Sequence, residues 1–526
     1  MRTRVLVATA LLLAVAGCLV HTAFGYSAYD LSGHALGSDD AWISYRYAWN
    51  LANGQGLVFN PGELVEGFSN LLYVLVLAGV FAVAPAVDIY LVSVFLNTAA
   101  VVAGGLALFR FAARELDNRS ALMAVFLFAL SPMIWLWASS GLETTVVVLC
   151  QLGIWFAVER VRQNADPRGL AVLAAWCIAL IFLRADGFLT PLAAVLYLGL
   201  HRRARPALIT FSAIVCAELA LTSFRLLYYG YPLPNTYYAK VSGPLLERVA
   251  DGAQKLAQVA MSTGMLAALL AIVIGVAWLL RSRAREGLRF SLLFPVLWLG
   301  YWLFIGGDHF FERFLLIVFP MGAMVVLRQL HAGGVKGQAW AFVCVLLLGM
   351  QLGPLAIDPR CKYVGEKYDR WVVLGEYVGR TYPGRRLATD AAGKLPYFSG
   401  LYTIDTLGLN DTHIARVPVD TFRSGHSKHD APYVLSKQPD LIAGWIEPSL
   451  DLRYGMDRTL YKPAGYRVTH LVNTSARRAE PNIVNTRGKT RRDIALLIAS
   501  GYQYAVLVRG PAPGDPDYAA NPEGTK

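Results

Sequence analysis

The stretch that decides the fold is S-D-D-A-W-I-S-Y-R-Y-A (residues 38–48), which follows the apolar run 5–24 near the start of the chain. The run is long enough to cross a bilayer, and Arg2 and Arg4 precede it. Because basic residues favour the cytoplasmic side of a membrane, residues 38–48 are expected outside the cytoplasm. Their tail has aromatic and apolar residues at helical spacing with Arg46 among them, which predicts a helix along the outer membrane interface.

Two adjacent carboxylates, Asp39 and Asp40, begin this stretch. Near a low-dielectric boundary, desolvation and mutual repulsion favour a bound proton on one of them, which suits a general base. Both residues are equally suited to capping the N-terminus of a solvated helix. The residues alone leave the two interpretations open.

The rest of the chain extends the membrane pattern. Of its 526 residues, 56% are hydrophobic and only 16% are charged, which is more apolar surface than one soluble core can bury. Apolar runs of about 15 to 22 residues recur from residue 5 to residue 354, as hydrocarbon-spanning helices require, and they stop after Ile357. We therefore expect a polytopic α-helical membrane protein.

The net charge of +12 does not indicate nucleic-acid binding, because the basic residues form no single stripe with interleaved aromatic residues. They lie between the apolar runs instead. The clusters are Arg110, Arg114, Arg119; Arg160, Arg162, Arg168; Arg202, Arg203, Arg205; Arg281, Arg283, Arg285, Arg289; and Arg328, Lys336. The positive-inside rule places each cluster in the cytoplasm.

This rule predicts about 11 spanning helices, with the N-terminus in the cytoplasm and everything after about residue 355 outside. The predicted spans lie near residues 5–24, 91–110, 120–138, 143–160, 169–184, 187–201, 206–226, 262–281, 288–305, 313–328 and 338–354. The apolar run 69–87 does not fit, because a crossing there would invert every later loop. The break at Ala84-Pro85-Ala86 favours a re-entrant or juxtamembrane segment.

With this topology, the remaining polar segments converge on the outer face and bring their carboxylates together. The segments are 25–70, Ser139–Glu143, Arg184–Gly187, Tyr231–Lys240 and Gly306–His309. Each also has a structural interpretation. Arg184 and Asp186 can form an internal salt bridge, the Tyr and Lys residues of 234–240 can anchor the interface, and His309 can be a hydrogen-bonded interfacial residue.

Residues 355–510 are expected to form an extracytoplasmic α/β domain, followed by a disordered tail, 511–526. Strand-like runs lie at Leu387–Thr389, Tyr402–Ile404, Leu441–Ala443 and Tyr504–Val508. The sequence shows no phosphate-cradling Gly-rich loop and no nucleophile elbow here, which favours recognition over chemistry. His426 and His429 form an H-x-x-H pair without accompanying cysteines, so we interpret them as structural.

Several segments resemble one known family. S-D-D-A-W-I-S-Y-R-Y-A-W-N-L-A-N-G-Q-G-L-V-F-N-P-G-E-L-V-E-G-F-S-N (38–70) closely resembles the first outer loop of the actinobacterial terminal arabinofuranosyltransferase family. The resemblance extends through S-G-L-E-T-T (140–145), R-A-D-G (184–187), P-N-T-Y-Y-A-K (234–240), G-G-D-H-F-F-E-R-F (306–314) and I-D-T-L-G-L-N-D (404–411). It covers nearly the whole chain, and the first-loop and P-N-T-Y-Y-A-K signatures are its specific parts. Ala185 departs from a more usual R-P-D-G.

The resemblance implies a GT-C fold with residues 1–354 as the transmembrane catalytic domain, in a bacterial plasma membrane. It implies a polyprenyl-phosphate sugar donor and an acceptor glycan or glycoconjugate, with arabinofuranose transfer in cell wall biogenesis as the leading case. It leaves a divalent metal requirement open.

The same resemblance implies that Asp39 or Asp40 is the general base of an inverting transfer. Candidates for holding the donor phosphate are Lys240, Arg184 and Arg313, and candidates for sugar hydroxyls are Glu143, Asp186 and Asp308. The other candidate substrate-binding residues are Arg46, Glu66, Asn235, Tyr238 and His309.

Two other classes of protein share this general pattern. A lipid-linked-sugar flippase or transporter would also be polytopic, but the charged residues cluster at one membrane face rather than at the midplane, and no inverted repeat is evident. A non-catalytic envelope assembly protein would have no need of the intact pair Asp39 and Asp40. Both alternatives therefore rank below a glycosyltransferase.

Overall fold

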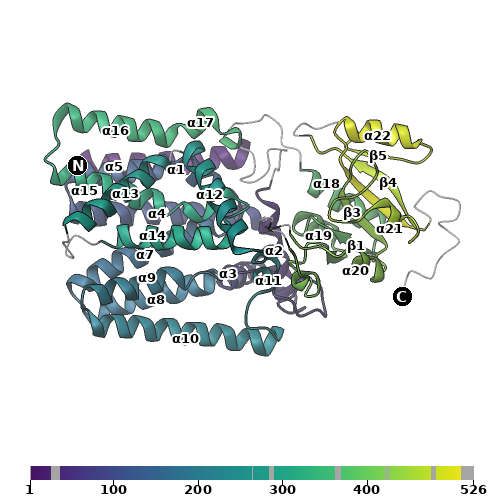
Figure 1. Cartoon of the computed structure of the whole chain (residues 1–526), viewed down its shortest axis with the longest axis horizontal. Helices are drawn as coiled ribbons and strands as arrows, with labels where there is room; N and C mark the ends of the chain where they lie inside the picture. Colours follow the sequence, from purple (N-terminus) through teal and green to yellow (C-terminus); the bar gives the residue numbers. More distant parts are fainter. Residues whose placement is uncertain are drawn as a thin grey trace.

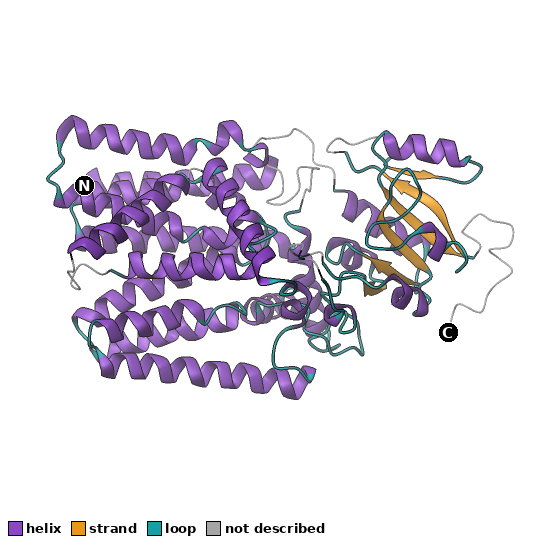
Figure 2. Ribbon diagram, viewed as in Figure 1, coloured by secondary structure: helices purple, strands orange, loops and turns teal. Residues whose placement is uncertain are grey.

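The computed structural model describes residues 2–24, 36–263, 265–282, 289–361, 369–420, 422, 425, 427–475 and 481–510. A bundle of helices is followed by a smaller domain built on a β-sheet, and the two lie end to end (Figures 1 and 2). Three helices lie between them: α2 (Asp39–Ala52), α3 (Leu71–Val83) and α11 (Asn235–Lys240). The predicted tail, 511–526, and His426 lie outside the described residues.

Within the described part of the chain, 6 helices are long and apolar enough to cross a membrane, or up to 8 if each of two bent helix pairs is one span. The six are α1 (Arg2–Phe24), α4 (Ile89–Glu115), α7 (Thr144–Gln163), α10 (Ala204–Tyr229), α15 (Val318–Ala332) and α16 (Gly337–Leu352), the last two with the short turns that adjoin them. The bent pairs are α5 (Asn118–Ala129) with α6 (Pro132–Ala138), at 51°, and α12 (Leu245–Ser262) with α13 (Met265–Ser282), at 113°. The chain is therefore a multi-pass membrane protein.

Four shorter apolar helices leave the predicted count of about 11 spans unconfirmed. They are α3, α8 (Pro167–Leu183), α9 (Leu189–Leu200) and α14 (Phe290–Ile305). The 13 residues of α3, in the run predicted to be re-entrant, reach about 20 Å, whereas the hydrocarbon layer is about 30 Å thick. The 12 residues of α9, in a run predicted to span, reach no farther. Length alone does not separate these two helices, so the roles of both stay predictions.

The basic ends of the helices lie together. Figure 1 shows the start of α1, the end of α13, the start of α14 and the α15–α16 connection at one end of the bundle, and the sheet domain at the other end. Arg281, Arg289 and the basic residues of 328–336 therefore lie far from the sheet domain, while Arg283 and Arg285 lie outside the described residues. This is the arrangement that the charge argument requires, and the orientation in the membrane stays a prediction.

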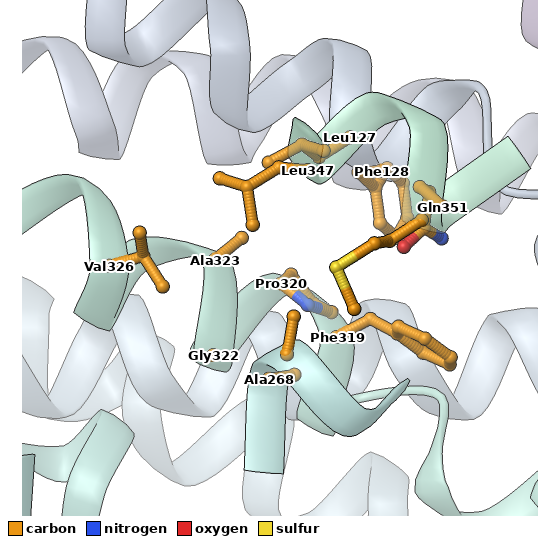
Figure 3. Close-up of a pocket in the computed structure, with 12 residues that line it drawn as sticks. Leu127, Phe128, Ala268, Phe319, Pro320, Gly322, Ala323, Val326, Leu347 and Gln351 are labelled. Atoms are coloured by element: carbon orange, nitrogen blue, oxygen red, sulfur yellow. The ribbon is translucent and has the colours of Figure 1, made fainter. Parts of the chain in front are cut away.

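The bundle has a small gap between α5, α13, α15 and α16 (Figure 3). Apolar side chains such as Leu127, Phe319 and Leu347 line it, and its volume is about 30 Å³. The Gln351 side chain also lines it, and its Nε2 has no hydrogen-bond partner among the described residues. A gap of this size holds about two water molecules, not a ligand.

The sheet domain is a mixed α/β structure, which confirms the predicted fold class of the C-terminal part. Its six strands are β1 (Arg386–Thr389), β2 (Tyr402–Asp405), β3 (Leu441–Trp445), β4 (Tyr466–Val472), β5 (Ile483–Asn485) and β6 (Tyr504–Arg509), in the order β2-β1-β3-β6-β4-β5. The pairs β1–β2 and β1–β3 are parallel and the other pairs are antiparallel. The four predicted strand runs are β1, β2, β3 and β6; β4 and β5 were not predicted.

Helices cover both faces of this sheet. Ala505 and Leu507 of β6 pack in a core with α20 (Ala431–Ser436), α21 (Arg458–Tyr461) and α22 (Arg491–Ala499). Tyr504, Val506 and Val508 point the other way, into a core with α18 (Arg370–Thr381) and α19 (Lys394–Ser399). Because both faces are buried, β6 is apolar at every position from Tyr504 to Val508 rather than at alternate positions.

Candidate functional site between the bundle and the sheet domain

The helix α2 places the predicted carboxylate pair where the bundle meets the sheet domain (Figure 1). Its aromatic residues differ in exposure, since Trp49 is 37% exposed whereas Trp42, Tyr45 and Tyr47 are buried. Trp42 is 4% exposed, and its ring packs against Tyr397 and Phe398 of α19 at centroid distances of 4.7 and 4.6 Å. The sheet domain therefore covers this part of the helix, and the predicted place of the helix along the membrane interface stays a prediction.

The Asp39 carboxylate is bound to the sheet domain. It accepts hydrogen bonds from the backbone N–H groups of Gly393 (3.0 Å) and Lys394 (2.8 Å), where α19 begins. A Cβ on Gly393 would lie 1.9 Å from the backbone oxygen of Asp39, so a side chain has no room there. Asp39 thus caps a helix, but the helix is α19, which comes more than 350 residues later in the chain.

Asp40 has different surroundings. Its Oδ2 lies 4.0 Å from Nζ of Lys240, the last residue of α11, and the two side chains are 30% and 38% exposed. The contact is a loose ion pair at a partly open surface, where solvent screens the attraction. Of the two adjacent carboxylates, Asp39 is bound by backbone N–H groups, whereas Asp40 pairs with a partly exposed cation.

The P-N-T-Y-Y-A-K segment is held by the protein at its start. The backbone N–H of Asn235 donates to the Glu66 carbonyl (2.9 Å), and its side-chain amide donates to the carbonyls of Gly408, Leu409 and Asp411 at 2.8 to 3.2 Å. The segment 234–240 therefore binds both the first loop and the I-D-T-L-G-L-N-D segment of the sheet domain. The side chain of Asn235 is committed to protein carbonyls, whereas Lys240 lies at the free end.

Arg416, in the short helix η4 (Ile414–Arg416), reaches this site from the sheet domain. Its guanidinium carbon lies 3.9 Å from the ring centroid of Tyr231 and 4.2 Å from that of Tyr238. Nη1 donates to Oδ1 of Asn235 (2.9 Å), while Nη2 is buried and has no hydrogen-bond partner among the described residues. A second cation thus lies beside α11, with donor capacity left over.

A buried ion network lies beyond α2. Arg184 contacts Asp186 (Nε to Oδ1, 2.7 Å) and Glu143 (Nη1 to Oε1, 3.4 Å), and each of the three is less than 10% exposed. Asn70 donates to Glu143 (2.7 Å) and accepts from Ser44 Oγ (3.1 Å), one turn along α2 from Asp40. The internal salt bridge considered for the R-A-D-G bend is therefore present, and Asn70 connects it to α2.

The G-G-D-H-F-F-E-R-F segment adjoins this network. Arg313 pairs with Asp308 (3.1 Å), and the guanidinium groups of Arg313 and Arg184 lie 4.8 and 4.0 Å from the ring centroid of Phe314. His309 lies near the sheet domain, where a Cβ on Gly425 would be 3.7 Å from its Cβ. The structure thus brings Glu143, Arg184, Asp186, Asp308 and Arg313 into one cluster.

Two other candidate residues bind groups of the protein itself. Arg46 is buried and donates to the carbonyls of Phe59, Pro396 and Leu401 at 2.6 to 2.8 Å. Glu66 is buried and pairs with Arg225 (2.9 Å); its burial, only partly offset by Arg225, raises the pKa of Glu66 to about 7. Both side chains join segments of the fold and lie away from open space.

Comparison with known proteins gives one match by sequence and several by structure. Residues 362–507 match a family model described as a domain of unknown function, DUF8728. No curated protein matches the chain. The apo oligosaccharyltransferase of Archaeoglobus fulgidus superposes with a TM-score of 0.56 at 12% identity, covering 93% of this chain and 75% of that one. The same archaeal enzyme, AglB, in complex with an inhibitory peptide and a dolichol-phosphate, gives a TM-score of 0.52 at 12% identity, with 91% and 74% covered.

A bacterial structure matches over nearly the full length of both chains. ArnT from Cupriavidus metallidurans, bound to undecaprenyl phosphate, superposes with a TM-score of 0.52 at 13% identity and covers 96% of this chain and 98% of that one. The chain has the GT-C fold. At these identities the likeness concerns the arrangement of the helices and of the sheet domain.

Sequence reasoning missed two charged features of this chain. Arg416 carries no motif of its own, and its sole signal is its position just after the I-D-T-L-G-L-N-D segment. Arg360, in η3 (Pro359–Cys361), pairs with Glu312 (3.1 Å) and Asp358 (2.6 Å), so the residues that follow α16 stay packed on the bundle. Within the described residues, no group of three or more His, Cys, Asp or Glu side chains gathers to hold a metal ion.

Proposed function

We propose that this protein is a membrane glycosyltransferase that moves a sugar from a polyprenyl-phosphate donor to an acceptor glycan outside the cytoplasm. The observation that carries the proposal is the Asp40–Lys240 pair, a partly exposed carboxylate beside a partly exposed cation at the junction of the two domains. Two proteins of the same fold support the donor class, since one is bound to undecaprenyl phosphate and the other to a dolichol-phosphate.

Asp40 is the general base in this proposal. Its carboxylate takes the proton from the acceptor hydroxyl while that oxygen attacks the anomeric carbon of the donor sugar. The bond between the anomeric carbon and the phosphate oxygen breaks, and polyprenyl phosphate leaves with the electron pair. Attack from the face opposite the leaving group inverts the configuration at the anomeric carbon.

Lys240 and Arg416 are the groups that counter the charge of the leaving phosphate. Lys240 is held loosely, 4.0 Å from Asp40, so a donor phosphate can compete for it. Arg416 has a buried Nη2 with no partner among the described residues, and a phosphate oxygen is an acceptor that would satisfy it. The roles first considered for Arg184 and Arg313 become secondary, because both are paired with carboxylates.

The identity of the sugar and of the acceptor rests on the motifs. The first-loop and P-N-T-Y-Y-A-K signatures resemble those of terminal arabinofuranosyltransferases, so arabinofuranose and a cell-wall glycan are the leading donor sugar and acceptor.

The proposed orientation has a cytoplasmic N-terminus and an extracytoplasmic sheet domain. Alkaline phosphatase fused after Pro359 tests it: the proposal expects an active enzyme there, and an inactive fusion that is nevertheless expressed reverses the orientation.

The activity test uses purified full-length protein, a labelled polyprenyl-phosphate pentose and an acceptor oligosaccharide, with the product analysed by mass spectrometry. A product one pentose heavier is expected from the parent protein, and Asp40→Asn should lower its yield at least about 100-fold while donor binding persists. Movement of intact donor between the two leaflets of a vesicle, without any product, would instead establish the flippase interpretation.

A further inference from the structure

The bundle also has a large cavity, which lies at the end opposite the sheet domain. A cavity of about 610 Å³ opens between α13, the start of α14 and the end of α15, beside the last turn of α4. This volume falls within the range of about 300–1,000 Å³ that ligand sites occupy, unlike the 30 Å³ gap in Figure 3. Its place in the bundle separates it from Asp40 and Lys240, so it is not the proposed donor site.

The inner walls of this cavity are apolar. Ile274, Leu292 and Val325 line it, and Ile274 is 57% exposed, so the cavity reaches the outer surface of α13. Val273 beside it is 63% exposed. At Gly275 the helices approach closely, since an added Cβ would lie 2.8 Å from Leu292 Cδ2 and 3.2 Å from Val325 Cγ1. The exposed residues Val273 and Ile274 therefore give an apolar chain access from the outer surface of α13, whereas the helices are closed together at Gly275.

The rim of the cavity is basic. Arg328 donates to Ser291 Oγ (2.9 Å) and to Glu115 (3.3 Å), and its side chain is 17% exposed. Arg289, at the start of α14, lies 3.9 Å from Glu159, which also contacts Arg162 at 3.2 Å. Among the residues that line the cavity, two guanidinium groups, Arg289 and Arg328, face one carboxylate, Glu115, and the excess charge is positive.

We propose that this cavity binds an anionic phospholipid, with one acyl chain against Ile274, Leu292 and Val325 and the phosphate against Arg289 and Arg328. An apolar chain joined to an anionic head group is the one ligand chemistry that fits both parts of the site. Basic pockets at the ends of membrane helices bind anionic lipid head groups, at about 1 kcal/mol for each Lys or Arg near the membrane surface. The charge and shape of the cavity carry this inference independently of the proposed transfer reaction.

The test is native mass spectrometry of the full-length protein in detergent, titrated separately with phosphatidylglycerol, with phosphatidylcholine of the same acyl chains, and with glycerol 3-phosphate. Phosphatidylglycerol should bind the parent protein most tightly. Arg289→Gln should weaken that binding about fivefold, and the double variant with Arg328→Gln about 25-fold. Arg160→Gln is the matched control, because Arg160 is 55% exposed, pairs with Asp166 and lies in another basic cluster.

Arg328 also bonds to Glu115, so Arg289→Gln and a charge-neutral variant, Leu292→Trp, are measured alone as well. Leu292→Trp fills the apolar part of the cavity. It should weaken the binding of both phospholipids and leave the preference for phosphatidylglycerol over phosphatidylcholine unchanged. Equal binding of the two phospholipids, equal binding of glycerol 3-phosphate and phosphatidylglycerol, or an equal loss in Arg160→Gln and Arg289→Gln would each overturn the proposal.

Discussion

The two faces of α2 differ in what they contact. Asp39, Trp42 and Arg46 are spaced three and four residues apart, so they lie on one face, and that face is bound to the sheet domain. Asp40 and Ser44 lie on the neighbouring face, toward Lys240 and Asn70. Because successive residues of a helix point about 100° apart, two adjacent aspartates take on different surroundings. Identical side chains therefore serve docking at one position and are available for chemistry at the next.

Asp40→Asn should give the largest effect and tests the open face directly. The amide keeps the size of the side chain but cannot accept a proton, so turnover should fall about 10²- to 10⁴-fold. The rate of product formation measures it, with donor binding and thermal unfolding as controls. A variant that folds, binds donor and keeps its turnover within a few-fold would show that both faces of α2 are structural.

On the face of α2 that contacts the sheet domain, Arg46→Met should destabilise the contact between the two domains most. The change leaves the buried carbonyls of Phe59, Pro396 and Leu401 without this donor, at roughly 1–3 kcal/mol each. The sheet domain should detach more readily, which faster hydrogen exchange in α19 would report. Arg380→Met is the control, since its side chain is 78% exposed in the same domain. If α19 exchanges equally slowly in both variants, Arg46 does not hold the domains together.

Lys240→Gln and Arg416→Gln test whether these two cations, on the Asp40 side of α2, bind the donor phosphate. Loss of one charge-assisted contact to the donor phosphate costs about 1.5–3 kcal/mol, which corresponds to roughly a 10- to 100-fold weaker interaction. We expect this as weaker donor binding, measured by titration with a polyprenyl-phosphate sugar. Lys437→Gln, at the C-terminal end of α20, serves as the control. Unchanged donor affinity in both variants would show that the donor phosphate does not bind beside Lys240 and Arg416.

The limits of sequence prediction are visible in the same two faces. The spacing of Asp39, Trp42 and Arg46 predicts a shared helix face, but not its contact with Gly393 and Pro396, because those partners come some 350 residues later.

The strand β4 was missed for a local reason. Its sequence carries Arg467 and His470 among apolar residues, and its register shifts between Val468 and His470, so the alternation expected of a strand is broken.

The runs that were predicted correctly are those whose burial is uniform. Tyr504–Val508 is covered on both faces, and its sequence is a continuous apolar run that predicts a buried strand. Arg184 and Asp186 of the R-A-D-G segment are buried and pair with each other, so two residues close in sequence were enough to predict that salt bridge. Arg416 differs, because its place between Tyr231 and Tyr238 exists only once the sheet domain has docked. Contacts made across the junction of the domains are therefore the part that sequence could not supply.

Asp39→Asn should have the smallest effect and is the sharpest test of the comparison. Asp39 uses both carboxylate oxygens, one for the N–H of Gly393 and the other for that of Lys394, whereas an asparagine has one acceptor oxygen. One of the two bonds should be lost, which costs about 1 kcal/mol of docking stability and a few-fold of turnover at most. Thermal unfolding and turnover are measured beside those of Asp40→Asn in the same preparation. Asp39→Ala, which loses both bonds, should lower the unfolding temperature further and leave catalysis comparably intact. If Asp39→Asn instead loses as much turnover as Asp40→Asn at unchanged stability, the roles of the two faces are reversed, and the base is the carboxylate that caps α19.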